Sequence, residues 1–322
     1  MSVTAYLHIS LELWGCIFCV IAGVTIALGK SSDEKARRYL FSMEFGNALL
    51  VLADAFAWLY RGSLSPEGYY IVRISNFLVF FTSNAIILLF TGYLSRFVDR
   101  RRIATRVAFC SVGVIAVSAE VLLIISQFTN LFYYYDSSNR YQRSSLFWVT
   151  QAVGVVCVLI DSVVLIANRK RISRENFCVL LSFMVLPMIA LIIQVFVYGY
   201  SLLNLALILS GLLMFMTFQI DQTRQLAQKE SELDEMRIKT MISQIQPHFI
   251  ANALTAIYSL IESDPPKAQE CVHSFAKYLR NNINSLESTS PIPFTQELEH
   301  IEEYLKIEKI RFGDRLNIEY DI

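Results

Sequence analysis

The sequence predicts an all-α fold, in which a bundle of seven transmembrane helices precedes a cytoplasmic helical hairpin. Three observations support this prediction. The chain has 322 residues, of which 54% are hydrophobic and 17% charged, whereas soluble domains carry about 25% charged residues. Apolar stretches of about 20 residues recur up to residue 220. The remainder is polar, with apolar residues at helical spacing.

The apolar stretches have the length that a membrane crossing requires. A hydrocarbon core of ~30 Å needs about 20 residues at a rise of 1.5 Å each. Each stretch therefore predicts one spanning helix, at about 6–29, 39–60, 70–95, 105–127, 144–168, 175–198 and 200–220. The last two are separated only by a short turn near Gly199, but together they are too long for one crossing.

Basic residues are concentrated in alternate connections between these spans. Residues 30–38, 96–106 and 169–174 hold 13 Lys and Arg, against three or four in the other connections. Because cytoplasmic loops carry this excess, we expect the N-terminus outside and everything after residue 220 in the cytoplasm. Residues 222–322 hold 11 basic and 16 acidic residues, which argues against nucleic acid as a partner.

Ionisable residues lie in the outer part of the predicted bundle. Glu12, Asp54 and Glu120 each fall ~10 Å below the outer surface, and Arg73 lies near the outer start of the third span. Such groups usually face the bundle interior. One hypothesis is an outward-facing vestibule of carboxylates that binds an extracytoplasmic ligand, either a cationic group or a shared proton. The other is that Arg73 pairs with one acid and serves packing alone.

The pattern becomes polar after Ile220. Leu226, Leu233 and Met236 follow the a/d spacing of a coiled coil. An apolar stripe then predicts a helix that ends near Ser263, formed by Ile238, Ile242, Ile245, Phe249, Ala253, Ala256, Ile257 and Leu260. Pro247 falls inside this helix, where it removes a hydrogen bond and loosens one turn.

A second amphipathic helix is predicted after the turn "SDPPK". Asp264 can cap it and Pro265 suits its first position. It covers 266–287, with an apolar stripe of Val272, Phe275, Leu279, Ile283 and Leu286. One hairpin buries only one stripe, so we expect two copies to form a homodimer with a four-helix bundle.

His248 is the candidate for chemistry in this hairpin. At 100° per residue it lies about 110° from the centre of the stripe, so it flanks the buried face and reaches water. Asn252 follows one turn later on the same flank. Such a histidine is either a surface residue without a role or a nucleophile, which needs a neutral, exposed imidazole.

The neighbouring residues favour the second interpretation. The segments "QIQPHFIANAL", "YLRNNI" and "ELEHIEEYLKIEKIRFGDRLNIEYDI" resemble the LytS-like class of bacterial sensor histidine kinases over about residues 235–322. The class pattern is met by Gln246, Pro247, His248, Phe249 and Asn252, and later by Tyr304, Leu305, Ile307, Glu308, Arg311 and Phe312. The sequence departs from the class pattern at Ala251, where the class usually has an aromatic residue. The spans resemble, more loosely, the multi-span sensor regions attached to such kinases.

The resemblance implies a two-component sensor kinase in the bacterial plasma membrane. His248 would be the phosphoacceptor that takes the γ-phosphoryl group of ATP, with Asn252 as its adjacent motif residue. A response-regulator aspartate would then receive the group. ATP and Mg are the cofactors of the class. The implied regions are 1–220 (sensor), 221–290 (signalling helix and dimerisation hairpin) and 291–322 (linker helix and start of the ATP-binding domain).

The last residues, "RLNIEYDI", alternate in the manner of a β-strand, which in the class would open the ATP-binding lobe. From residue 199 onward the only glycines are Gly199, Gly211 and Gly313, too few for a phosphate-cradling loop. We therefore expect no activity from this chain alone, although a full-length partner could phosphorylate His248 in a mixed dimer. Two alternatives remain: a non-catalytic receptor or remnant that acts through partner binding, and a transporter whose acids move ions.

Overall fold

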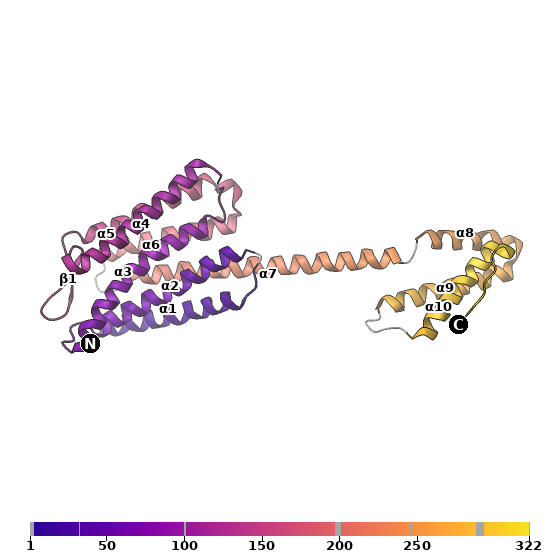
Figure 1. Cartoon of the computed structure of the whole chain (residues 1–322), viewed down its shortest axis with the longest axis horizontal. Helices are drawn as coiled ribbons and strands as arrows, with labels where there is room; N and C mark the ends of the chain where they lie inside the picture. Colours follow the sequence, from indigo (N-terminus) through magenta and orange to yellow (C-terminus); the bar gives the residue numbers. More distant parts are fainter. Residues whose placement is uncertain are drawn as a thin grey trace. The chain divides into compact units, whose positions relative to one another are not determined.

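The computed structural model describes residues 3–31, 33–99, 101–196, 201–244, 247–287 and 293–321. The chain divides into two compact units, Met1–Arg224 and Gln225–Ile322. Helices dominate both units, as predicted. Figure 1 shows their order along the chain.

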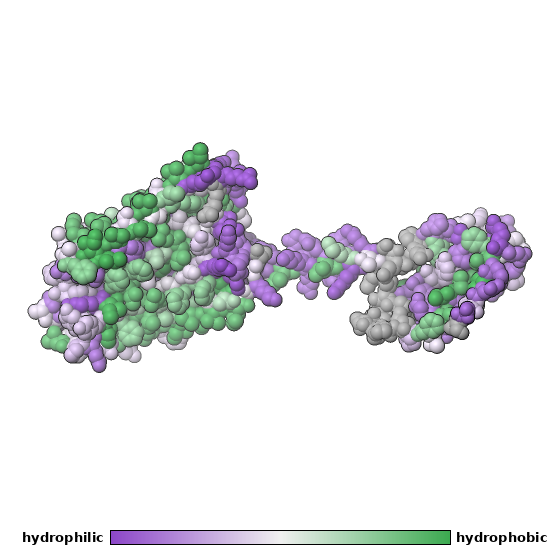
Figure 2. Space-filling model, viewed as in Figure 1, coloured by the Kyte–Doolittle hydropathy of each residue, from purple (hydrophilic) through white to green (hydrophobic). Residues whose placement is uncertain are grey.

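Among the described residues, seven helices are long and apolar enough to cross a membrane, which confirms the predicted number. Six lie in the first unit, and the seventh begins there and continues into the second. Apolar side chains cover much of the visible face of the first unit in Figure 2, as a lipid solvent requires. The predicted turn near Gly199 lies outside the described residues. The helices are α1 (Val3–Leu28), α2 (Glu34–Leu59), α3 (Pro66–Leu94), α4 (Ile103–Thr129), α5 (Phe147–Ala167), α6 (Arg174–Phe196) and α7 (Leu202–Gln244).

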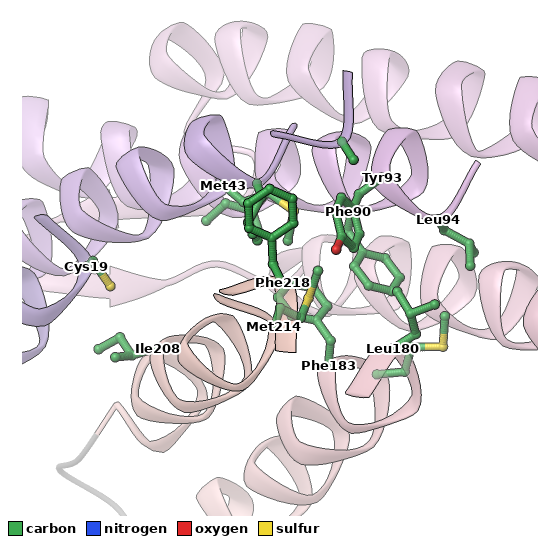
Figure 3. Close-up of a cluster of buried hydrophobic side chains, with 14 of the residues drawn as sticks. Cys19, Met43, Phe90, Tyr93, Leu94, Leu180, Phe183, Ile208, Met214 and Phe218 are labelled. Atoms are coloured by element: carbon green, nitrogen blue, oxygen red, sulfur yellow. The ribbon is translucent and has the colours of Figure 1, made fainter. Parts of the chain in front are cut away.

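Helix α2 lies at the centre of this unit. In its apolar window 61% of the residues are buried, against 22–33% for the other spans. The apolar core, part of which Figure 3 shows, brings together side chains from several spans. Within it, the rings of Phe90 and Phe183 stack at 4.4 Å between α3 and α6. Close packing of this kind drives helix association in lipid.

Two short elements connect the spans. Strands β1 (Tyr133–Tyr135) and β2 (Tyr141–Arg143) form an antiparallel hairpin between α4 and α5, which the sequence analysis did not predict. A single 3₁₀ turn, η1 (Arg169–Arg171), precedes α6. Tyr133 of β1 and Phe132 just before it pack against Leu123 of α4.

The second unit contains α8 (Pro247–Ser263), α9 (Pro265–Glu287), α10 (Phe294–Phe312) and the 3₁₀ turn η2 (Gly313–Arg315). Helices α8 and α9 form the predicted hairpin, and the Lys267 N–H donates to the Asp264 carboxylate at 3.3 Å at the turn. Helix α10 then packs on both. One chain therefore covers part of its own hairpin, which the sequence analysis assigned to a second copy.

Two local expectations in this unit were wrong. Pro247 does not lie inside a helix, because α7 ends at Gln244 and α8 begins at Pro247. Proline lacks an N–H and has a fixed φ, so it fits the first position of a helix. The expected strand over the last residues is also not formed, since 316–321 are irregular. A strand requires a hydrogen-bonded neighbour, and the described part of this unit has none.

We predict that Gly92→Ala destabilises the membrane unit. A Cβ there would lie 2.4 Å from a ring carbon of Tyr39, and overpacking of this kind costs roughly 1–3 kcal/mol. Gly113→Ala is the matched control, because nothing lies within 4 Å of its added Cβ. Thermal unfolding in detergent should show a lower midpoint for Gly92→Ala only. Equal midpoints for the two variants would contradict the close approach of α2 and α3.

Candidate functional site

The first turn of α8 presents His248 beside a buried aromatic residue. The Phe249 side chain is 4% exposed, and its ring centroid lies 4.8 Å from those of both Tyr278 and Tyr304. Successive helical residues point about 100° apart, so the burial of Phe249 turns His248 outward. The structure places His248 at an exposed position, where a second molecule can reach the imidazole.

Asn252 is the polar neighbour of this imidazole. Its Nδ2 lies 3.2 Å from His248 Nδ1 and 3.3 Å from Nε2. The i,i+4 spacing places the amide over the ring, and the side chain is half-buried beside Ala253 in the core. The amide therefore restricts the ring while one face stays open. Both site residues expected from the sequence lie together.

The interior of this unit is formed by all three helices. Cys271, Phe275 and Tyr278 of α9 are buried. Val272 and Ile283, which the sequence analysis assigned to the buried stripe, are each 49% exposed. Helix α10 packs on α9 and inserts Ile307 and Tyr304, so the buried stripe of α9 is centred on Cys271 and Tyr278 instead.

A buried carboxylate connects α10 to α9. Glu303 is 5% exposed and accepts from Lys277 Nζ at 3.1 Å and from Lys306 Nζ at 3.0 Å. Burial alone would raise the pKa of Glu303, but hydrogen bonds from Lys306, Lys277 and Ser274 outweigh it and hold the pKa at about 2. This ion pair therefore stabilises the helix that covers Phe249.

A second group of polar side chains lies inside the membrane unit. His8 and Glu12 of α1 meet Asp54 of α2, and one ligand atom of each lies within 4.8 Å of the others. Two residues that the sequence analysis missed complete this outer cluster. Asn204 Nδ2 donates to Glu12 Oε1 at 2.9 Å and to Asp54 Oδ2 at 3.0 Å. Ser201 Oγ donates to Asp54 Oδ2 at 2.7 Å. An asparagine inside an apolar span was the available signal for Asn204.

The other two charged residues expected in the vestibule lie elsewhere. Arg73 donates to Asn139 Oδ1 at 2.7 Å, and its guanidinium lies over the rings of Tyr69 and Tyr135 at 3.5 and 4.4 Å. Among the described residues Arg73 forms no ion pair, so the expected pairing with an acid was wrong. Cation–π contacts and the Asn139 side-chain amide stabilise its guanidinium instead. Glu120 lies beside Asn84.

A cavity of about 540 Å³ lies next to the outer cluster. Asp54, Ser201 and Asn204 form part of its wall, together with Trp58 and Arg61. Its volume is in the range of small-molecule sites in proteins. The remaining wall is largely apolar and comes from α3 to α7 and the β-hairpin.

Two protein families match the chain. The family described as the N-terminal 7TM region of histidine kinase matches residues 13–223. The family described as histidine kinase matches residues 236–316. Together they cover both structural units. No solved structure matches the chain.

Curated relatives match about a third of this chain. "Sensor histidine kinase YpdA" of Escherichia coli is 38% identical over 108 residues, which is 32% of this chain and 19% of that protein. "Sensor protein LytS" of Enterococcus faecalis is 37% identical over 90 residues, 28% of this chain and 15% of that one. "Sensor protein LytS" of Staphylococcus saprophyticus is 33% identical over 101 residues, 30% and 17% of the two chains. The matched stretches thus span less than a fifth of these relatives.

We predict that the second unit loses stability as the pH falls from the pKa of Glu303 in the unfolded chain to its lower pKa in the fold. Its pKa is about 2 in the fold and 4.5 without partners, so the stabilisation is complete above pH 4.5 and is lost toward pH 2. Glu303→Gln removes the carboxylate at every pH and should cost roughly 1–3 kcal/mol.

Pepsin, which works in acid, can measure this effect. Cleavage within residues 247–321 should increase steeply below pH 4.5 in the wild-type chain, while Glu303→Gln is already cleaved at pH 5. Glu299→Gln, an exposed position on the same helix, is the control for the pH dependence of pepsin itself. A pH profile of Glu303→Gln that matches this control would contradict the ion pair.

Proposed function

This chain belongs to the histidine kinases with an N-terminal seven-transmembrane region, and we propose that it acts as a membrane sensor kinase of a two-component system. In this proposal His248 accepts a phosphoryl group and passes it to an aspartate of a response regulator. One observation carries the proposal: an exposed imidazole lies in the first turn of α8, beside a packed aromatic core. The match of residues 236–316 to histidine kinases supports it.

The arrangement suits nucleophilic attack by a ring nitrogen. A neutral imidazole holds its proton on one nitrogen and a lone pair on the other. The Asn252 amide nitrogen lies beside the ring, 3.2 and 3.3 Å from its two nitrogens, and so restricts the orientation of the imidazole. Asn252 is in this account a positioning residue. The proton stays on one ring nitrogen while the new bond forms at the other.

ATP, with Mg²⁺ bound to its phosphates, is the phosphoryl source that we propose for this reaction, as in the resembled class, and ADP would be the leaving group. The residues of this chain do not suit a nucleotide cradle, because residues 225–322 contain one glycine, Gly313, and phosphate loops require several. Residues 225–322 therefore supply the acceptor side of the transfer. The nucleotide would be held by another polypeptide segment.

A homodimer is the assembly that we propose for the second unit. Large apolar side chains remain exposed on it: Leu254, Ile261, Val272 and Ile283 on α8 and α9 are 49–54% exposed. On α7, Leu226, Leu233 and Met236 are 57–64% exposed at coiled-coil spacing. Exposed apolar patches of this kind mark interaction surfaces, and a second copy offers the matching faces.

The orientation follows from the basic residues. We propose that the N-terminus and the β-hairpin lie outside, while η1 and the second unit lie in the cytoplasm, where the response regulator is found. Arg169, Lys170 and Arg171 all fall in η1. The outer cluster then faces the extracytoplasmic side, where it can meet an external ligand.

The phosphoacceptor assignment predicts one labelled residue. The chain is mixed with the separately purified ATP-binding lobe of a full-length relative and with radiolabelled ATP. Wild type should acquire acid-labile label, and His248→Gln should acquire none. His273→Gln, an exposed histidine on α9, is the matched control and should keep the label. Asn252→Ala should slow labelling about fivefold, since a positioning hydrogen bond is worth about 1 kcal/mol. Label retained in His248→Gln would refute the assignment, and no label on any chain would favour a non-catalytic receptor.

The proposed orientation predicts which cysteines a membrane-impermeant maleimide can reach in intact cells. Cys110 and Cys178, the two exposed native cysteines, are first replaced by serine. Ser138→Cys in the β-hairpin should then react, whereas Ser173→Cys before α6 should react only after the cells are permeabilised. Both positions are exposed, so access depends on the side of the membrane. The reverse pattern would place the N-terminus inside.

A further inference from the structure

The outer cluster has the donor set of a metal site. It offers one imidazole and two carboxylates, and these three side chains are 0–9% exposed. His8 Nε2 lies 3.5 Å from Glu12 Oε1 and 3.3 Å from Asp54 Oδ2. Ligand atoms about 2.0–2.1 Å from a tetrahedral metal lie about 3.3–3.4 Å apart. The two separations from His8 match that spacing, and the three side chains each offer one ligand atom within 4.8 Å of the others.

The cluster also lacks a balancing positive charge. In the salt bridges between described residues, Glu12 and Asp54 are joined only to His8. Glu12 is 0% exposed, and its Oε2 is buried without a hydrogen-bond partner in the described structure. A carboxylate oxygen left in this state inside a membrane is costly. A divalent cation would remove that cost by giving the Glu12 carboxylate a positively charged partner.

We propose that His8, Glu12 and Asp54 form a binding site for a divalent transition-metal ion, with Zn²⁺ as the best-fitting member. The imidazole excludes Mg²⁺ and Ca²⁺ as preferred ions, because these favour all-oxygen sites. Three protein ligands leave a position for water, as in open zinc sites. Asn204 and Ser201 hold the carboxylates in place from outside the ligand set.

The adjoining cavity provides the entry path. Asp54, Ser201 and Asn204 line both the cluster and the cavity of about 540 Å³. An ion can therefore reach Asp54 without separating α1 from α2. Trp58, another residue of the cavity wall, lies against His8 with ring centroids 4.8 Å apart. This contact restricts rotation of the imidazole ring.

Metal binding would alter the start of α7. In the structure the Ser201 N–H lies 3.5 Å from His8 Nδ1 as a donor, so the ring proton belongs on Nε2, facing Asp54. Ligation through Nε2 moves that proton to Nδ1 by way of water, and the Ser201 N–H contact is lost. A signalling role for this change rests on the proposed sensor function. The proposal of the binding site does not depend on that function.

The test measures bound zinc directly, with no kinase reaction. The full chain, purified without a histidine tag and with its thiols blocked, is placed in lipid nanodiscs and dialysed against micromolar Zn²⁺. Wild type should retain about one Zn²⁺ per chain, and His8→Gln and Glu12→Gln should lose it. Glu120→Gln is the matched control, because this span carboxyl lies outside the cluster, and it should keep the ion.

Thermal unfolding gives a second readout that separates lost binding from lost folding. Zn²⁺ in excess should raise the unfolding midpoint of wild type by about 5 °C, with no rise for Glu12→Gln and no rise with Mg²⁺. Wild type that retains no zinc would overturn the proposal whatever the variants do. Equal zinc in wild type and His8→Gln would do the same. Neither outcome bears on labelling of His248.

Discussion

The burial of Phe249 determines which way α8 faces, and the accessibility of the candidate phosphoacceptor depends on it. Phe249 and Ala253 lie in the core, 4% and 1% exposed, and they fix the rotation of the helix at two points one turn apart. His248 and Asn252 are the residues just before each of them, so both fall on the flank. Tyr304 of α10 forms part of the pocket for Phe249. The exposure of His248 therefore depends on a helix more than 40 residues downstream and on the Glu303 ion pair that holds it.

Many polar side chains in the membrane unit bond to one another, because lipid offers them no water. At one place α1, α2 and α7 share hydrogen bonds through Glu12, Asp54 and Asn204. At another, Asn139 joins the β-hairpin to α3 by donating to the carbonyls of Ser63 and Gly68 at 2.9 and 3.1 Å. Directional hydrogen bonds thus join α1, α2 and α7 at one place and the β-hairpin and α3 at another, and a ligand can rearrange such bonds.

Hydropathy predicted the seven spans because membrane insertion depends on length and composition alone. Helical periodicity likewise predicted the exposure of His248, because 100° per residue is a local property. Pairings between distant segments were not predictable. Ser201 and Asn204 donate hydrogen bonds to Asp54, about 150 residues away in the sequence. Arg73 donates to Asn139 and not to an acidic residue. Glu44, buried and beside Cys19, was overlooked although it lies in an apolar span. Pro247 was misplaced because proline at a helix start and proline in a kinked helix leave similar sequence patterns.

Helix α7 packs closely against α1 and α2. A Cβ added at Gly15 of α1 would lie 2.4 Å from Ile208, and one added at Gly211 of α7 would lie 2.8 Å from Glu44 Oε1. The two glycines therefore allow α7 to approach α1 and α2 closely, and a larger side chain at either position would require Ile208 or Glu44 to move. Packed interfaces of this kind shift between discrete arrangements rather than continuously. A ligand at Ser201 and Asn204 would act by changing which arrangement has the lower free energy, since differential affinity is the only means by which binding shifts a conformational equilibrium.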